Sequence, residues 1–285
     1  MFTKKWSALP FVLPGVVGLA LFYALPFLGG VYYSLTDGGF ENKFVWFQNY
    51  RAIWQNPMFG IGLKNTLFFS MVCAPLVWAL SFVLAGLLNR IKPAGGFFRA
   101  SALLPYLMPS GAVLLIWLVL FDFGGPINRI VEMLGTARVN WLKGPAMRTP
   151  VIAMFVWKNL GFATIIFLAA LQNVPEPLYE YARLEGCGFW GQLWHITLPN
   201  VVPGAFLVFV LCWINAFKIF KEAYFIGGAY PDEALYTLQN YMNNMFSKLN
   251  YQSVTTAAYT FALIVFGIFA VLFLIQKRLI RRLEG

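Results

Sequence analysis

Six stretches of this chain are apolar for twenty or more residues, and they constrain the fold more than any other feature. A membrane-spanning helix needs about 20 mostly apolar residues to cross a core about 30 Å thick. Only helices and closed barrels satisfy every backbone group in lipid, and no stretch alternates with a period of two. We predict an all-α membrane protein with six transmembrane helices, at approximately residues 9–35, 63–88, 101–121, 150–171, 201–226 and 255–275.

The composition agrees with this prediction. The chain is 60% apolar and only 11% charged, whereas soluble domains are about a quarter charged. Intrinsic disorder is excluded because it requires low hydrophobicity. The net charge of +10 is attributed to orientation in the membrane, because no dense basic run suggests a nucleic-acid partner. The 285 residues are predicted to form a single domain embedded in membrane lipid.

The first stretch is interpreted as an uncleaved span. It is longer than the apolar part of an ordinary signal peptide and has no A-x-A cleavage site after it. It also carries Pro10, Pro14 and Pro26. An uncleaved first span suits a protein of the bacterial cytoplasmic (inner) membrane.

The orientation follows from the density of basic residues, since cytoplasmic loops are enriched in Lys and Arg. One side is densely basic, and the other has its basic residues spread through longer loops. Both termini and residues 172–200 are therefore expected in the cytoplasm. The dense side holds Lys4, Lys5, Arg90, Lys92, Arg99, Lys277, Arg278, Arg281 and Arg282.

Residues 174–200, here called the bracket, lie between the fourth and fifth predicted spans and are too polar to cross the membrane. We expect a short helix at 178–184 and an interruption at Gly186 and Gly188, where glycine permits either a positive φ or a tight chain approach. A second helix is expected at 189–196, and Leu198-Pro199 ends it. Its large apolar residues require either a partner protein or the membrane interface. They are Phe189, Trp190, Leu193 and Trp194.

The bracket matches a known pattern. Glu180-Tyr181-Ala182, Gly186, Ile196 and Leu198-Pro199 fit the spacing E-A-A-x3-G-x9-I-x-L-P, except that Tyr181 replaces the second alanine. This resembles the cytoplasmic loop of permease subunits of binding-protein-dependent ABC importers. The resemblance extends over nearly the whole chain, for example through FVWFQNYRAIWQNP and GPINRIVEMLG, and narrows to the sugar-type, maltose-permease-like subfamily. The usual T-x-G-G-P after the fifth span is altered here to IGGAYP at residues 226–231.

The resemblance implies a role in the ATP-driven import of a carbohydrate, and we expect this carbohydrate to be an oligosaccharide. It implies a second permease subunit in a heterodimer, two ATPase subunits that bind ATP and Mg²⁺, and an extracytoplasmic solute-binding protein. This chain would bind no cofactor itself. The bracket would sit in a cleft of an ATPase and move with it, because short rigid helices transmit a displacement that a flexible loop would absorb. The implied coupling residues are Glu180, Ala182, Glu185, Gly186, Phe189, Trp190, Leu198 and Pro199.

Polar residues inside the spans are candidates for the substrate path, since ionisable groups are costly in the bilayer. Asn215, Lys218 and Glu222 fall on one face of the fifth span, with Lys218 and Glu222 as an i,i+4 pair. Either this pair neutralises itself near the interface, or the face offers hydrogen bonds to sugar hydroxyls, which the resemblance favours. Further candidates are Lys158, Tyr224 and Tyr259.

No catalytic constellation is evident, and the chain is not expected to be an enzyme. A single histidine, His195, cannot form a metal site or a triad, and no G-x-x-x-x-G-K-[ST] motif is present. The three cysteines are interpreted as reduced packing residues without a metal. Two alternatives remain. The first is an importer permease for another solute, such as glycerol phosphate or a polyol, and Lys218 and Lys221 would then meet an anion. The second is a secondary transporter, which would need inverted repeats and carboxylates in the middle of the membrane.

Overall fold

A computed structural model of the chain describes residues 9–39, 41–90 and 95–284, so the predicted orientation signals Lys4, Lys5 and Lys92 lie outside the described residues. Within the described part, five helical stretches are long and apolar enough to cross a membrane. They are Pro10–Ser34, Pro57–Arg90, Gly144–Gln172, Phe189–Gly227 and Tyr251–Arg278. A bent pair of helices makes six if it is counted as one span. The prediction of a helical membrane protein is confirmed.

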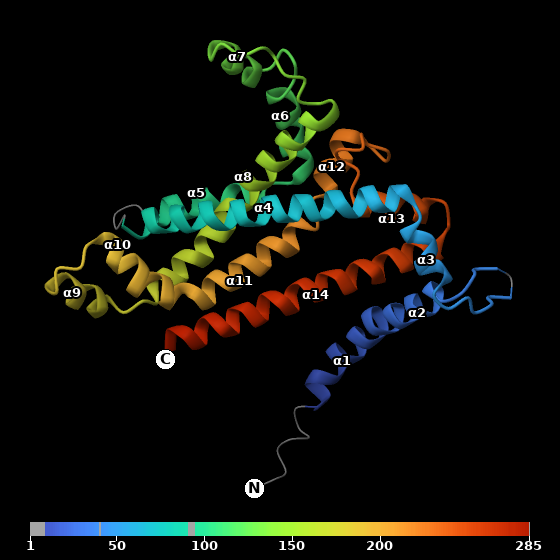
Figure 1. The fold of residues 1–285 in the computed structure, drawn as a ribbon, viewed down its shortest axis with the longest axis horizontal. Helices are drawn as coiled ribbons and strands as arrows, with labels where there is room; N and C mark the ends of the chain where they lie inside the picture. The colour runs from blue at the N-terminus through green and yellow to red at the C-terminus, as the bar shows by residue number, and fades with distance from the viewer. Residues whose placement is uncertain (1–8, 40, 91–94, 285) are drawn as a thin grey trace, which may run out of the picture. The chain divides into compact units, whose positions relative to one another are not determined.

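The helices of the first half, labelled in Figure 1, are α1 (Leu9–Leu19), the π-helical η1 (Ala20–Ala24), α2 (Leu25–Ser34), α3 (Gln48–Trp54), α4 (Pro57–Arg90), α5 (Gly95–Leu107), α6 (Ser110–Leu120) and α7 (Pro126–Met133). Those that follow are the 3₁₀-helical η2 (Gly144–Met147), α8 (Arg148–Gln172), α9 (Glu176–Leu184), α10 (Phe189–Gln192), the π-helical η3 (Leu193–Thr197), α11 (Leu198–Ala216), α12 (Phe220–Gly227), α13 (Leu238–Ser247) and α14 (Tyr251–Glu284).

The third predicted span is not one continuous helix. The structure divides it into α5 and α6, which are bent by 90° relative to each other. Pro109 is the N-cap of α6, with φ −57° and ψ 128°. The residue before a proline is disfavoured in the helical conformation, so α5 ends at Leu107 and the chain turns through Met108. The proline signal was present in the sequence, but the prediction gave more weight to the continuous apolar run.

The contacts within the chain divide it into two compact units. That these units act as a single functional domain stays a prediction. The larger unit comprises residues 61–240 and 266–285. In it, α8 packs against both α5 and α11 (Figure 1). Helices in lipid associate through close van der Waals packing, which small residues permit. A Cβ at Gly161 of α8 would overlap the carbonyl oxygen of Ala102 in α5, so the two backbones touch at this glycine.

Aromatic side chains complete the core of the larger unit. Phe167 of α8 is fully buried and meets the ring of Trp78 in α4 edge-to-face, with the ring centroids 5.8 Å apart. The indole N–H of Trp78 donates to the carbonyl oxygen of Ala205 in α11 at 2.8 Å. A backbone carbonyl oxygen has two lone pairs, so that of Ala205 can accept this bond as well as one within its helix. Trp78 thus ties α4 to both α8 and α11.

The smaller unit comprises residues 1–60 and 241–265. Tyr259 of α14 packs edge-to-face on Phe27 of α2, with ring centroids 5.1 Å apart, and its hydroxyl donates to the carbonyl oxygen of the same Phe27. After α2, the amide of Asn49 donates to the carbonyl oxygens of Ser34 (3.0 Å) and Thr36 (2.8 Å). These bonds satisfy backbone groups where the first span ends.

Candidate functional site

Helix α9 begins at Glu176, two residues before the predicted start, and ends in a glycine turn. The N–H of Gly186 donates to the carbonyl oxygen of Arg183 at 3.1 Å, and the N–H of Cys187 donates to that of Ala182 at 2.8 Å. This pair of bonds is a Schellman motif, which places a left-handed residue just after the helix. Gly186 occupies that position with φ +75°, as predicted. Gly188 has φ −73° and needs no glycine conformation, so the prediction was wrong for that residue.

The second half of the bracket differs from the prediction. Leu198 and Pro199 do not end the second helix, because α10 continues through η3 into α11. Pro199 stands in the first turn of α11, where its missing N–H is tolerated. The π turn η3 precedes it and widens the helix. The bracket is therefore one free helix, α9, followed by an extension of the fifth span itself.

Most of the predicted coupling residues lie at the surface of the bracket. Glu180, Glu185 and Gly186 are exposed, and Ala182, Leu198 and Pro199 are half-buried. Arg183 pairs with Glu176 at 3.3 Å and leaves Glu180 outside that ion pair. The large apolar side chains of the bracket are also exposed, namely Leu178 (41%), Tyr181 (68%), Leu184 (84%), Phe189 (55%), Trp190 (69%) and Trp194 (63%). An exposed apolar surface of this kind is a candidate for contact with another protein.

Three residues of the bracket region were missed by the sequence analysis. The hydroxyl of Tyr179 lies 3.0 Å from that of Thr197, and the guanidinium of Arg90 lies over the ring of Phe189, 5.1 Å from its centroid. These contacts join α9 to η3 and the end of α4 to α10. They depend on which side of each helix faces the core, so the sequence spacing alone did not reveal them. His195, in contrast, bonds locally to the carbonyl oxygen of Gly191.

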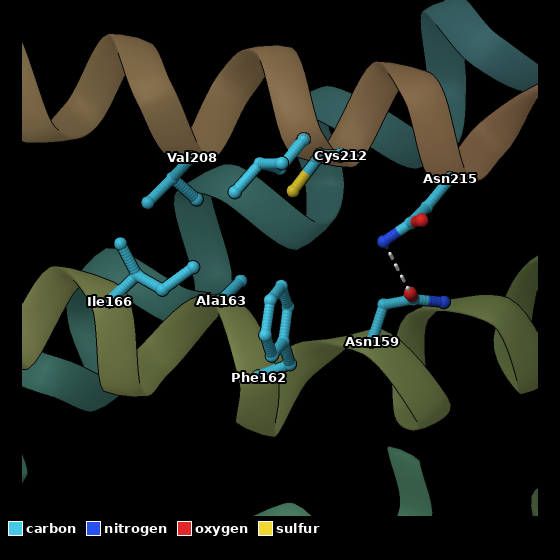
Figure 2. A pocket seen from close by; sticks show the side chains of 8 residues that line it. Asn159, Phe162, Ala163, Ile166, Val208, Cys212 and Asn215 are labelled. Carbon is cyan, nitrogen blue, oxygen red and sulfur yellow. Dashed lines mark hydrogen bonds between the residues drawn. The ribbon is translucent and has the colours of Figure 1, made fainter. Parts of the chain in front are cut away.

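A small pocket lies between α8 and α11, with a cavity volume of about 10 Å³, close to the space that one water molecule needs. Figure 2 shows apolar side chains along most of it and two amides at one end. The amide of Asn215 donates to the side-chain oxygen of Asn159 at 3.3 Å. Asn215 was predicted to line the path, whereas Asn159 was not predicted, although it follows Lys158 directly. The pocket is lined by Asn159, Phe162, Ala163, Ile166, Val208, Leu211, Cys212 and Asn215.

The neighbouring charged residues are arranged differently from the prediction. α11 ends at Ala216 and α12 begins at Phe220, so Lys218 and Glu222 do not share one helical face and the predicted i,i+4 pair is wrong. Lys218 is exposed, whereas Glu222 is buried. The positive charges that act on the Glu222 carboxylate are those of Lys158 and Lys221. Of the three residues in the break, Lys218 and Ile219 each donate their N–H to a carbonyl oxygen three residues back, which tightens the turn.

Other predicted path residues have varied surroundings. The ammonium group of Lys158 donates to the hydroxyl of Ser110 at the start of α6, so a half-buried cation joins α8 to α6. Tyr224 is 40% exposed and packs against Phe220 in α12, with ring centroids 5.3 Å apart and the ring planes tilted by 48°. Tyr259 belongs to the smaller unit, where its ring and hydroxyl are both engaged with Phe27.

The segment after α12 is held by polar side chains. The guanidinium of Arg148 donates to the side-chain oxygen of Asn65 at 2.9 Å and to the carbonyl oxygen of Ala234 at 3.2 Å. The amide of Asn65 donates to the carbonyl oxygens of Glu233 (2.6 Å) and Tyr236 (3.0 Å). This network ties residues 233–236, which follow the altered IGGAYP segment, to α4 and α8.

The segment between α6 and α8 carries an exposed ion pair. Arg138 donates two hydrogen bonds to the carboxylate of Glu132, at 2.7 and 3.1 Å. These bonds lower the pKa of Glu132, because they favour its charged form. Nearby, Asn128 is buried and accepts hydrogen bonds from the N–H of Val139 and the indole of Trp141, at 3.0 Å each. The two contacts fold this segment onto α7.

Comparison with known proteins gives a consistent result. The profile of the family "Binding-protein-dependent transport system inner membrane component" matches residues 79–285, more than half of the chain. The lactose transport system permease protein LacF of Rhizobium radiobacter is 28% identical, over 90% of this chain and 89% of its own length. The trehalose/maltose transport system permease protein MalF of Thermococcus litoralis is 31% identical, over 81% and 82%. The sn-glycerol-3-phosphate transport system permease protein UgpA of Pectobacterium atrosepticum is 29% identical, over 76% and 75%.

Solved structures show the same fold. A crystal structure of a bacterial ABC transporter involved in the import of the acidic polysaccharide alginate superposes with a TM-score of 0.81 at 22% identity, covering 99% of this chain and 97% of that one. A second structure, of the alginate transporter in complex with its alginate pentasaccharide-bound periplasmic protein, gives the same TM-score over 98% and 95%.

Proposed function

Because this chain belongs to the binding-protein-dependent transport system inner membrane component family, we propose that it is the transmembrane subunit of an ATP-driven importer that moves a carbohydrate delivered by an extracytoplasmic binding protein. The substrate class is supported by the relatives, whose names specify lactose and trehalose/maltose. Dependence on a binding protein is a property of the family, and it argues against the secondary-transporter alternative. The match to an alginate transporter in complex with its periplasmic protein supports such a partner.

The observation that carries the energetic part of the proposal is the bracket. Helix α9 ends in a rigid glycine turn, and the next helix is continuous with the fifth span. A force applied to α10 is therefore applied to α11 without a flexible joint between them. The exposed Phe189 and Trp190 would fill a cleft on an ATPase subunit. ATP and Mg²⁺ would be bound by that partner, and this chain performs no hydrolysis in the proposed mechanism.

The proposed assembly contains one bracket from this chain and one from a second, similar permease subunit, in a heterodimer above two ATPase subunits. It would lie in the bacterial cytoplasmic membrane, with the bracket and both termini in the cytoplasm. The dense basic residues on that side of the spans support this orientation. Glu180 would bind a basic residue of the ATPase through a charge-assisted contact, and its exposure leaves it available for one.

The substrate path would pass the polar groups of α8 and α11. Asn159 and Asn215 present amide donors and acceptors at one end of the pocket (Figure 2), and Lys158 lies half-buried beside them. Amides and ammonium groups hydrogen-bond sugar hydroxyls, and these side chains would meet a sugar as it moves along the path. Glycerol phosphate is the second candidate, because UgpA is a relative and Lys218 and Lys221 are exposed cations.

Reconstitution tests the proposal directly. The assembled complex in proteoliposomes should hydrolyse MgATP faster when its loaded binding protein is present, and it should accumulate the solute only with ATP. Uptake of maltose-type sugars with no uptake of glycerol phosphate supports the carbohydrate proposal, and the reverse result supports the second candidate. Transport at an equal rate without the ATPase subunits would refute both.

A further inference from the structure

The joint between α10 and α11 is a π turn. In η3, the N–H of Leu198 bonds to the carbonyl oxygen of Leu193, five residues back. A π turn holds one residue more than an α turn, and such turns are rare and are frequently found at functional sites. The turn lies where the bracket becomes the fifth span, so its geometry decides how α10 is oriented relative to α11.

A chain of side-chain hydrogen bonds crosses this turn. The hydroxyl of Thr197, at the end of η3, donates to the carbonyl oxygen of Gln192 at 3.3 Å. Since that proton is used, the hydroxyl of Tyr179 is the donor in the 3.0 Å contact between Tyr179 and Thr197. The side-chain amide of Gln192 donates in turn to the carbonyl oxygen of Cys187 at 2.8 Å. These bonds link α9, the glycine turn and the π turn.

The surroundings of Tyr179 set it apart from its neighbours in α9. Its ring is half-buried and packs against the hydrophobic core of the larger unit, whereas Leu178 and Tyr181 are exposed. Thr197 is buried, with 9% of its surface exposed. The hydrogen bond between them therefore lies on the core side of the bracket, away from the apolar surface that is available to a partner.

We infer that the Tyr179–Thr197 hydrogen bond holds η3 in its π form and thereby sets the direction in which α10 presents Phe189 and Trp190. Tyr179 and Thr197 are positioning residues, and the inference rests on the proposed coupling function of the bracket. If η3 rewound to α geometry, one residue would leave the turn. α10 would then rotate by roughly 100° and shift by about 1.5 Å relative to α11. A rotation of that size removes both aromatic rings from the docking surface.

The first test uses the purified chain and needs no partner. Cys187 is half-buried, and a Cβ at Gly191 in α10 would overlap its sulfur, so a rotated α10 must change its exposure. Cys73 and Cys212 are buried, which leaves Cys187 as the fast-reacting thiol. The rate of maleimide modification should rise about fivefold in Tyr179→Phe, as for the loss of one hydrogen bond. It should rise at least as much in Thr197→Val, which also loses the bond to Gln192. Thr197→Ser, which keeps the hydroxyl, should react like the wild type.

Two further variants make this test specific. The double variant Tyr179→Phe/Thr197→Val should react no faster than Thr197→Val alone, because Thr197→Val already removes the hydrogen bond to Tyr179. Tyr23→Phe, which removes the hydroxyl of a tyrosine that is 74% exposed in η1, should have no effect. Equal rates in all variants would overturn the inference, and so would additive effects in the double variant.

The second test uses the assembled complex and separates the inference from the proposed function. Stimulation of MgATP hydrolysis by the binding protein should fall about fivefold in Thr197→Val and recover in Thr197→Ser. If Trp190→Ala abolishes stimulation and Thr197→Val leaves it intact, the bracket couples as proposed but the inference is wrong. If neither variant alters stimulation, the proposed function of the bracket is itself wrong.

Discussion

The backbone N–H of Cys187 donates to the carbonyl oxygen of Ala182 at 2.8 Å, and this contact closes the turn that ends α9. The bond forms only when the residue between Glu185 and Cys187 adopts a left-handed conformation, which Gly186 does with φ +75°. The motif that resembles the importer loop therefore has a local physical basis. The acceptor is the backbone carbonyl oxygen of residue 182, which any side chain would leave in place, so the turn requires the glycine alone.

Replacing Gly186 with valine should uncouple the importer. A Cβ at this position meets nothing within 4 Å, so the cost is conformational, about 1–2 kcal/mol for a left-handed residue. We expect the variant to insert into the membrane normally and to lose most of its binding-protein-stimulated ATP hydrolysis, measured in proteoliposomes. Gly186→Asn should retain more activity, because asparagine tolerates the left-handed region. Gly188→Ser should behave like the wild type, and full stimulation in Gly186→Val would contradict the prediction.

Replacing Gly161 with alanine should destabilise the larger unit. The added methyl group would overlap the carbonyl oxygen of Ala102, and a backbone atom cannot move aside as a side chain can. Overpacking typically costs about 1–3 kcal/mol, so the melting temperature in detergent should fall clearly. The matched control is Gly86→Ala in α4, where a Cβ meets nothing within 4 Å. Similar melting temperatures for the two variants would show that α5 and α8 are not in contact at Gly161.

Removal of the Asn65 side chain should loosen the segment after α12. Asn65→Ala would leave the carbonyl oxygens of Glu233 and Tyr236 without their side-chain donor, and Arg148 without one acceptor. A buried group that loses its partner costs about 1–3 kcal/mol. Thermal unfolding should show this loss, together with faster hydrogen exchange in residues 231–237. Asn140→Ala, at an exposed position, is the control, and exchange that is unchanged in Asn65→Ala would count against the network.

Cysteine accessibility tests the proposed path. Lys218 is exposed and Asn215 is half-buried, so Lys218→Cys should react readily with a charged, water-soluble thiol reagent and Asn215→Cys more slowly. Reaction at both positions should decrease when the loaded binding protein and ATP are present. Leu207→Cys, at an exposed apolar position of α11, should not react if that surface faces lipid. No reaction at either Asn215→Cys or Lys218→Cys would return these residues to a structural role.

The local features of the bracket could be predicted from the sequence because they depend on neighbours in the chain. The position of Gly186, the helical 178–184 segment and the exposed aromatics all follow from spacing over a few residues. The break at Pro109 could also have been predicted, since its cause is local. The continuation of α10 through Pro199 was not predicted, because a proline inside a helical pattern usually ends the helix.

The length and apolarity of the six stretches by themselves determined that this chain is a helical membrane protein, since lipid offers no partner to an open backbone. The tertiary structure decided which polar side chains meet. It placed Asn159 against Asn215, Lys158 against Ser110, and Tyr179 against Thr197. Each pair joins two helices, and the rotation of one helix about its axis relative to another depends on packing across the interface. Spacing along one helix carries no information about that rotation.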